Sequence, residues 1–96
     1  MKDNIFDTAM QMLCKEAITK FGAEKQIQKA IEEMGELLTE LGRLPIGRTD
    51  NKKIIEEIVD VSFMMLQLAY AFGIDDYINY IDVKKRKIEQ RLSKIE

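Results

Sequence analysis

Hydrophobic residues recur at helical spacing along most of the chain, and this spacing predicts four helices. Asp3 is a suitable N-cap for the first helix, and Gly22 and Gly73 are suitable stops for the first and the third. The chain is therefore expected to form an all-α domain, a four-helix bundle. The predicted helices run from about Asp3 to Phe21, from Ala23 to Leu41, from Asp50 or Asn51 to Phe72, and from Asp75 or Asp76 toward the C-terminus.

The third predicted helix carries more apolar residues than any of the other three. The third helix is apolar nearly all round, and Asp60 is its only formal charge between Ile58 and Ile74, so we expect it to be buried within the domain or against another copy of the chain. An ionised Asp60 without a partner would be costly there unless it faced a polar cleft or a cation. On the second helix, the expected core face consists of Ile27, Ala30, Ile31, Met34, Leu37, Leu38 and Leu41.

One short phrase occurs twice, as KAIEEMGE at 29–36 and as KIIEEIVD at 53–60. Pro45 and Gly47 lie midway between the copies and should reverse the chain into an antiparallel helical hairpin. Each copy then carries two carboxylates one helical turn apart, at about the same distance from the turn. We expect the four carboxylates to meet at the same height, with Glu33 and Asp60 pointing inward and Glu36 farther round its helix; Glu57 completes the group.

Composition narrows the possible functions. The 96 residues are expected to form one domain, 1–96, and 15 basic against 17 acidic residues argue against general nucleic-acid binding. Without histidine, Ser-His and Cys-His nucleophiles and imidazole zinc sites are excluded, and Cys14 alone cannot form an intramolecular disulfide. No signal-peptide apolar region and no run long enough to span a bilayer are present, so we expect a cytoplasmic protein that does not contact membranes.

Converging carboxylates repel one another, and a cation relieves that repulsion. Ligands that are all oxygen favour Mg²⁺, with Mn²⁺ as the second choice. Such a site receives further oxygens from a phosphate-bearing substrate. Tyr77, Tyr80, Lys84, Lys87 and Arg91 form an aromatic and basic stripe on the fourth helix, and its three basic residues are candidates to bind phosphate.

The acidic motifs resemble those of a known family. Glu32-Glu33-Met-Gly-Glu36 and Glu57-Ile-Val-Asp60 are similar to the EExxE and ExxD motifs of the MazG-like all-α nucleotide pyrophosphohydrolases, and the resemblance extends from about Phe21 to Arg91. Phe21-Gly22 lies where many relatives have Trp-Gly, and Gln26 matches a glutamine ahead of the acidic motif.

The resemblance implies hydrolysis of a nucleoside triphosphate to the monophosphate and pyrophosphate, with magnesium, in a homodimer or a dimer of dimers. Water would attack the α-phosphorus. The implied metal ligands are Glu33, Glu36, Glu57 and Asp60; the candidate catalytic residues are Glu32 and Glu36, with Glu40 as another possible general base; and the candidate substrate-binding residues are Gln26, Lys29, Lys84, Lys87 and Arg91.

Three other functions are compatible with the pattern. The related phosphoribosyl-ATP pyrophosphohydrolases of histidine synthesis share the reaction type. A non-catalytic helical dimer that acts as a regulatory or binding module would keep the fold without the chemistry. A di-iron protein of the ferritin type also places carboxylates on bundle helices, but such sites normally use Glu-x-x-His, and this chain has no histidine.

Overall fold

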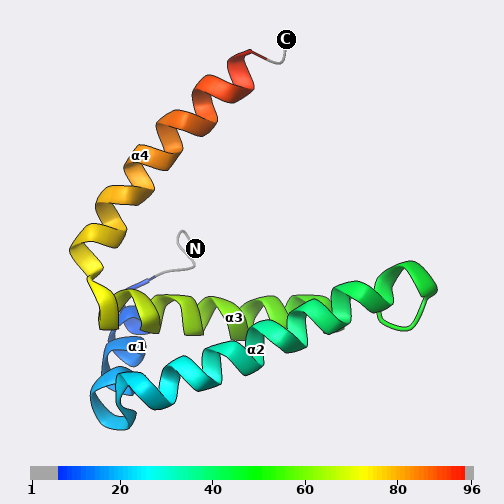
Figure 1. Cartoon of the computed structure of the whole chain (residues 1–96), viewed down its shortest axis with the longest axis horizontal. Coiled ribbons are helices and arrows are strands. Elements are labelled where there is room, and N and C mark those ends of the chain that lie inside the picture. Colours follow the sequence, from blue (N-terminus) through cyan, green and yellow to red (C-terminus); the bar gives the residue numbers. More distant parts are fainter. Residues whose placement is uncertain (1–6, 95–96) are drawn as a thin grey trace.

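The computed structural model describes residues 7–94, which form four α-helices and one short 3₁₀ helix, with no strand in that part of the chain. The all-α prediction is confirmed. Three of the α-helices lie together, and the fourth extends away from them (Figure 1). The elements are α1 (Thr8–Phe21), α2 (Ala23–Arg43), η1 (Leu44–Ile46), α3 (Asn51–Phe72) and α4 (Ile74–Ser93).

Two aspartates fix the starts of α1 and α3. Asp50 accepts a hydrogen bond from the backbone N–H of Lys53 at 2.9 Å, so α3 begins where the sequence predicted. Asp7 accepts from the N–H of Met10 at 2.9 Å, so α1 begins at Thr8, later than predicted. The cap predicted for this helix, Asp3, lies outside the described residues.

The predicted hairpin between the two acidic phrases is present. Helix α2 continues two residues past its predicted end, and Pro45 lies in η1, where the missing proline N–H is tolerated in the first helical turn. Gly47 follows with φ of 70°, a left-handed conformation that favours glycine. Helix α3 then returns along α2 (Figure 1), which places the two copies of the repeated phrase on neighbouring helices.

The small apolar core lies between α1 and the second half of α3. Cys14, Leu66 and Ala69 form its buried centre, and partly buried residues such as Phe63 and Tyr77 pack around them. The Cys14 thiol donates to the carbonyl oxygen of Phe63 at 3.5 Å, and burial raises the pKa of this thiol. Cys14 is therefore a packing residue with little thiolate character at neutral pH.

The seam between α2 and α3 is polar rather than apolar on the α2 side. Gln26 and Glu40 are buried there together with Ala30, whereas Leu38 is 72% exposed. The predicted core face of α2 is thus only partly right within one copy of the chain: Ala30 is buried and Ile27 and Leu37 are half-buried, but residues of the polar flank share the seam. Four residues of that face remain on the surface as one strip at i, i+3, i+7 and i+10, called the apolar strip below: Ile31, Met34, Leu38 and Leu41.

Helix α4 leaves the other helices at Gly73, whose φ of 141° is accessible mainly to glycine. The bend between α3 and α4 is 117°, and none of the described residues of α4 is buried. Ile78, Ile81 and Ile88 on its apolar side are exposed. Within the described residues, no single helix is long and apolar enough to cross a membrane; α3 and α4 together meet that criterion only by length and composition, as a bent pair.

Candidate metal centre

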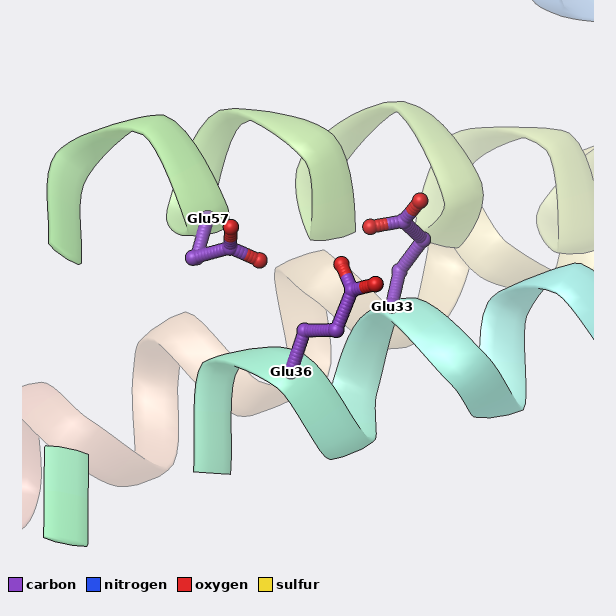
Figure 2. Close-up of side chains that lie close together, drawn as sticks. All are labelled: Glu33, Glu36 and Glu57. Carbon is purple, nitrogen blue, oxygen red and sulfur yellow. The ribbon is translucent and has the colours of Figure 1, made fainter. Parts of the chain in front are cut away.

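Three of the four predicted carboxylates meet between α2 and α3. Glu33 and Glu36 come from α2 and Glu57 from α3, and their side chains converge in the space between the two ribbons (Figure 2). One carboxylate oxygen from each residue lies within 4.8 Å of the other two. We call Glu33, Glu36 and Glu57 the acidic cluster.

Two oxygens of the acidic cluster are buried and have no hydrogen-bond partner among the described residues: Oε2 of Glu33 and Oε2 of Glu57. Glu57 is only 5% exposed, and the side chain of Glu33 is 14% exposed. A buried carboxylate oxygen without a partner destabilises the fold, because the protein does not replace the hydrogen bonds that water would give. The two oxygens therefore mark where a cation or donor group would be most stabilising.

Glu33 and Glu57 are each paired, through Oε1, with the lysine one turn earlier in the same helix. Lys29 Nζ lies 3.4 Å from Oε1 of Glu33, and Lys53 Nζ lies 3.3 Å from Oε1 of Glu57. The hydrogen bond and charge of Glu57 raise the pKa of the Lys53 ammonium above its usual value. Both lysines are about half exposed, so these pairs lie at the rim of the cluster.

Glu36 is the exposed member of the cluster. The charge of Glu33 raises the pKa of Glu36, and a hydrogen bond with Glu33 adds to this effect, as does the charge of Glu57. Repulsion between neighbouring carboxylates is thus the main cause of the raised pKa of Glu36. Glu36 takes up a proton more readily in the folded state than a free glutamate does, because protonation removes one of three neighbouring negative charges.

This shift predicts a pH dependence of stability in the absence of divalent cations. Because the folded-state pKa of Glu36 lies above its ordinary value, the native state binds the proton more tightly, and Glu36 contributes stability as the pH falls through the raised pKa. Glu36→Gln should therefore raise the melting temperature in EDTA at about pH 7, and this advantage should shrink toward about pH 5. Thermal unfolding of both proteins at the two pH values tests this; an offset that does not depend on pH would contradict it.

Asp60, the fourth predicted carboxylate, is not part of the cluster. It is exposed in the structure, so the expectation that Asp60 points inward is wrong for a single copy. Successive residues turn by about 100°, and Asp60 is therefore rotated roughly 60° from Glu57, past the line of contact with α2. Its role as a metal ligand stays a prediction.

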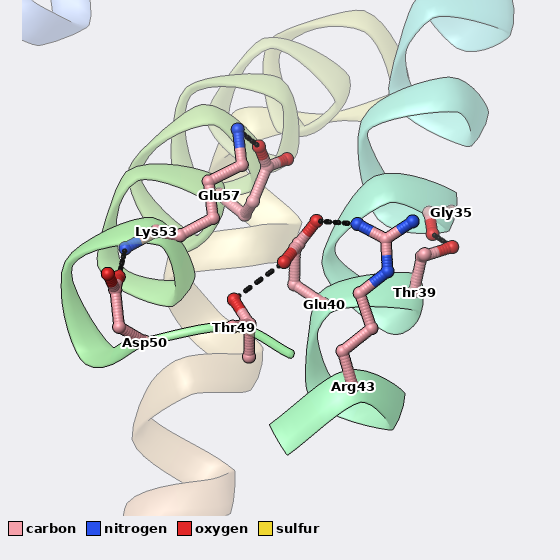
Figure 3. Close-up of polar contacts among 8 residues, drawn as sticks. All are labelled: Gly35, Thr39, Glu40, Arg43, Thr49, Asp50, Lys53 and Glu57. Carbon is pink, nitrogen blue, oxygen red and sulfur yellow. Dashed lines mark hydrogen bonds and ion pairs between the residues drawn. The ribbon is translucent and has the colours of Figure 1, made fainter. Parts of the chain in front are cut away.

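Glu40 has a structural environment that the sequence did not reveal. It is 7% exposed, and both of its oxygens are engaged: Arg43 donates to Oε2 at 2.9 Å and Thr49 donates to Oε1 at 2.6 Å (Figure 3). The Thr49 contact ties the segment before α3 back onto α2. Because both oxygens are occupied, the structure gives Glu40 a role in holding the hairpin closed.

Removing the Thr49 hydroxyl should destabilise this connection. In Thr49→Val a buried carboxylate oxygen loses its donor, and we expect a loss of about 1–3 kcal/mol in the free energy of unfolding. Thr39→Val is the matched control, because the exposed Thr39 hydroxyl donates only to the carbonyl of Gly35 in its own helix; a change of about 0.5 kcal/mol or less is expected. Urea unfolding measures both, and equal effects of the two substitutions would contradict this role.

The predicted substrate-binding residues have different environments. Gln26 is buried and donates from Nε2 to Oε1 of Gln67 at 2.7 Å, inside the α2–α3 seam, so its amide already has a partner. Lys29 lies at the acidic cluster through its pair with Glu33. Glu32, the predicted general base, is exposed and lies outside the cluster, and its catalytic role stays a prediction.

The predicted phosphate-binding residues of α4 are not brought to the acidic cluster within one copy. Lys84, Lys87 and Arg91 are exposed along α4, which makes no contact with α2 and extends away from the other helices (Figure 1). Their contact with substrate stays a prediction.

Lys53 was missed by the sequence argument, although a signal was present. The repeated phrase begins with lysine in both copies, and lysine four residues before glutamate is a pairing distance on a helix. Gln67, the partner of Gln26, had no signal, because a lone glutamine in an apolar helix does not reveal which residue it faces.

The donor set fits a hard divalent cation. Oxygen ligands lie about 2.0–2.6 Å from Mg²⁺ or Ca²⁺, so opposite ligands are roughly 4–5 Å apart, which is compatible with oxygens that lie within 4.8 Å of one another.

The sequence matches no family model, and no curated protein and no solved structure matches it either. Function is therefore inferred from the acidic cluster and its surroundings.

Proposed function

We propose that this protein is a magnesium-dependent nucleoside triphosphate pyrophosphohydrolase that releases pyrophosphate and a nucleoside monophosphate. The observation that carries the proposal is the pair of buried, unpartnered oxygens on Glu33 and Glu57, which belong to two helices and to one cluster with Glu36. The resemblance of the two acidic motifs to the MazG-like family supports the same reaction.

The proposed roles of the cluster residues differ with their burial. Glu33 and Glu57 are held by the two helices and by their lysines, so they would hold a Mg²⁺ ion with little rearrangement. Glu36 is exposed and can move toward the ion, and Asp60 would need to turn inward to join it. Bound Mg²⁺ supplies Lewis-acid stabilisation of the negative charge that develops on a phosphoryl group.

We further propose that the active form is a homodimer or a dimer of dimers. The apolar strip of α2 lies on the surface, with Ile31 61% and Leu38 72% exposed, and Ile55 and Ile58 of α3 are exposed as well. Helix α4 has no buried residue, yet most helical stability in proteins comes from packing of an apolar face. A second copy that covers these surfaces would complete a four-helix bundle of the MazG-like type and could bring basic residues of α4 to a neighbouring cluster.

The reaction is tested by a panel of common and modified nucleoside triphosphates with Mg²⁺ or Mn²⁺ and a pyrophosphate readout. The proposal predicts divalent-dependent release from at least one nucleotide, and phosphoribosyl-ATP in the same panel separates the related activity of histidine synthesis. No release from any substrate would overturn the proposal. If calorimetry also showed no magnesium-dependent nucleotide binding, the non-catalytic dimer would be favoured.

A further inference from the structure

The two lysines of the repeated phrase stand in equivalent places around the acidic cluster. Each lies four residues before a glutamate of the cluster and contacts only its Oε1, at 3.4 Å for Lys29 and 3.3 Å for Lys53. Oε2 of the same glutamate is left buried and without a partner. The lysines therefore occupy one oxygen of each carboxylate and leave the other available. Glu36 has no such lysine, because residue 32 is a glutamate.

The lysines change the charge of the site by two units. Three carboxylates alone would carry a formal charge of minus three, and a divalent cation would leave minus one. With both ammonium groups present, the group carries minus one, and a divalent cation turns it to plus one. A polyphosphate is attracted to the second arrangement and repelled by the first.

We propose that Lys53, together with Lys29, sets this charge balance: the two ammonium groups weaken cation binding to the acidic cluster and strengthen polyphosphate binding once the cation is present. This inference rests on the proposed function, because it assigns a role at the same site. Lys53 then has two opposite effects, one on the cation and one on the anion. A lysine that only oriented Glu57 would strengthen the binding of both.

The Lys53 ammonium lies close to the cluster, so removal of its charge should change the affinity for the cation and for the polyphosphate measurably. A unit charge several ångströms from a divalent ion at the rim of a site changes its affinity by about tenfold. Lys53→Met should therefore bind Mn²⁺ alone about tenfold more tightly than wild type and inorganic triphosphate, at saturating Mn²⁺, about tenfold more weakly. Because the Lys53 side chain is half exposed, Lys53→Met should remain folded, which circular dichroism checks.

Isothermal titration calorimetry of the full chain, first with Mn²⁺ alone and then with inorganic triphosphate, tests the inference. Lys53→Arg keeps the charge and should resemble wild type. Lys52→Met removes a neighbouring charge of the same helical turn that has no ion pair with any residue between 7 and 94, and it should also resemble wild type in both titrations.

The outcomes separate this inference from the proposed function. If wild type binds Mn²⁺ but Lys53→Met binds it equally or more weakly, the charge-balance role is overturned while the cation site stands. If wild type binds no Mn²⁺, both the cation site and the role of the lysines are overturned. If the opposed shifts are found but no nucleotide is hydrolysed, the charge balance is supported and the proposed reaction fails.

Discussion

Glu57→Gln is expected to abolish divalent cation binding and, with it, any magnesium-dependent hydrolysis. Glu57 is 5% exposed, and its Oε2 is one of the two unpartnered buried oxygens of the cluster. An amide replaces a negative oxygen with a neutral group and so removes the strongest fixed attraction for the ion. Loss of residues that merely support metal ligands typically costs about 10–100-fold in affinity, so loss of a ligand should weaken Mn²⁺ binding by more than about 100-fold.

Glu56→Gln provides the matched control for that experiment. Glu56 is the preceding residue of the same repeated phrase, but it is exposed and lies outside the cluster, so its substitution should leave Mn²⁺ affinity close to that of wild type. Calorimetry with Mn²⁺ and circular dichroism of each variant distinguish lost binding from lost folding. If the Glu57→Gln variant is folded and binds Mn²⁺ as tightly as wild type does, the acidic cluster is not the cation site.

If the protein forms the proposed homodimer, Leu38→Asp is expected to convert it to monomers. Leu38 is 72% exposed in one copy and lies at the middle of the apolar strip, where a second copy would cover it. Burial of a leucine contributes about 1.5–3 kcal/mol, and a buried unpaired carboxylate adds a further cost. Together these terms should weaken association by about 100-fold or more. Sedimentation velocity across a concentration series measures the change.

Thr39→Asp introduces the same charge at the neighbouring position, about 100° farther round the helix and off the strip. This control should associate as wild type does. If the wild-type chain sediments as a monomer at high micromolar concentration, or if Leu38→Asp and Thr39→Asp behave alike, the apolar strip does not form the interface. In a monomer, Leu38→Asp would change the free energy of unfolding by only about 0.5 kcal/mol.

Local chemistry made much of the fold predictable. Asp50 and Gly73 act on neighbouring backbone groups, so both ends of α3 followed from the sequence. Asp3 and Asp7 are equally good caps by residue type, and local chemistry did not choose between them. The direction of α4 depends on the backbone angles at Gly73, which glycine leaves unrestricted and which hydrophobic spacing does not encode.

The sequence predicted where along the two helices the carboxylates lie, but not which of them point into the seam between the helices. The two pairs of carboxylates lie at equal distances from the turn, which places them at the same height along the hairpin. Which of the four carboxylates point into the seam depends on the strips of α2 and α3 that face each other. Apolar spacing favoured the strip that contains Leu38, whereas buried Gln26 and Glu40 place the polar flank in the seam. An apolar strip that stays on the surface of one copy has the same spacing in the sequence as one that packs in the core.

Hydrolysis of an accepted nucleoside triphosphate in ¹⁸O-enriched water, with mass spectrometry of the products, tests the proposed reaction most directly. Attack of water on the α-phosphorus predicts ¹⁸O in the nucleoside monophosphate, unlabelled pyrophosphate, and loss of both products when Mg²⁺ is removed or Glu57 is replaced by glutamine. Labelled orthophosphate accompanied by a nucleoside diphosphate, or turnover that does not depend on a divalent cation, would contradict a pyrophosphohydrolase centred on Glu33, Glu36 and Glu57.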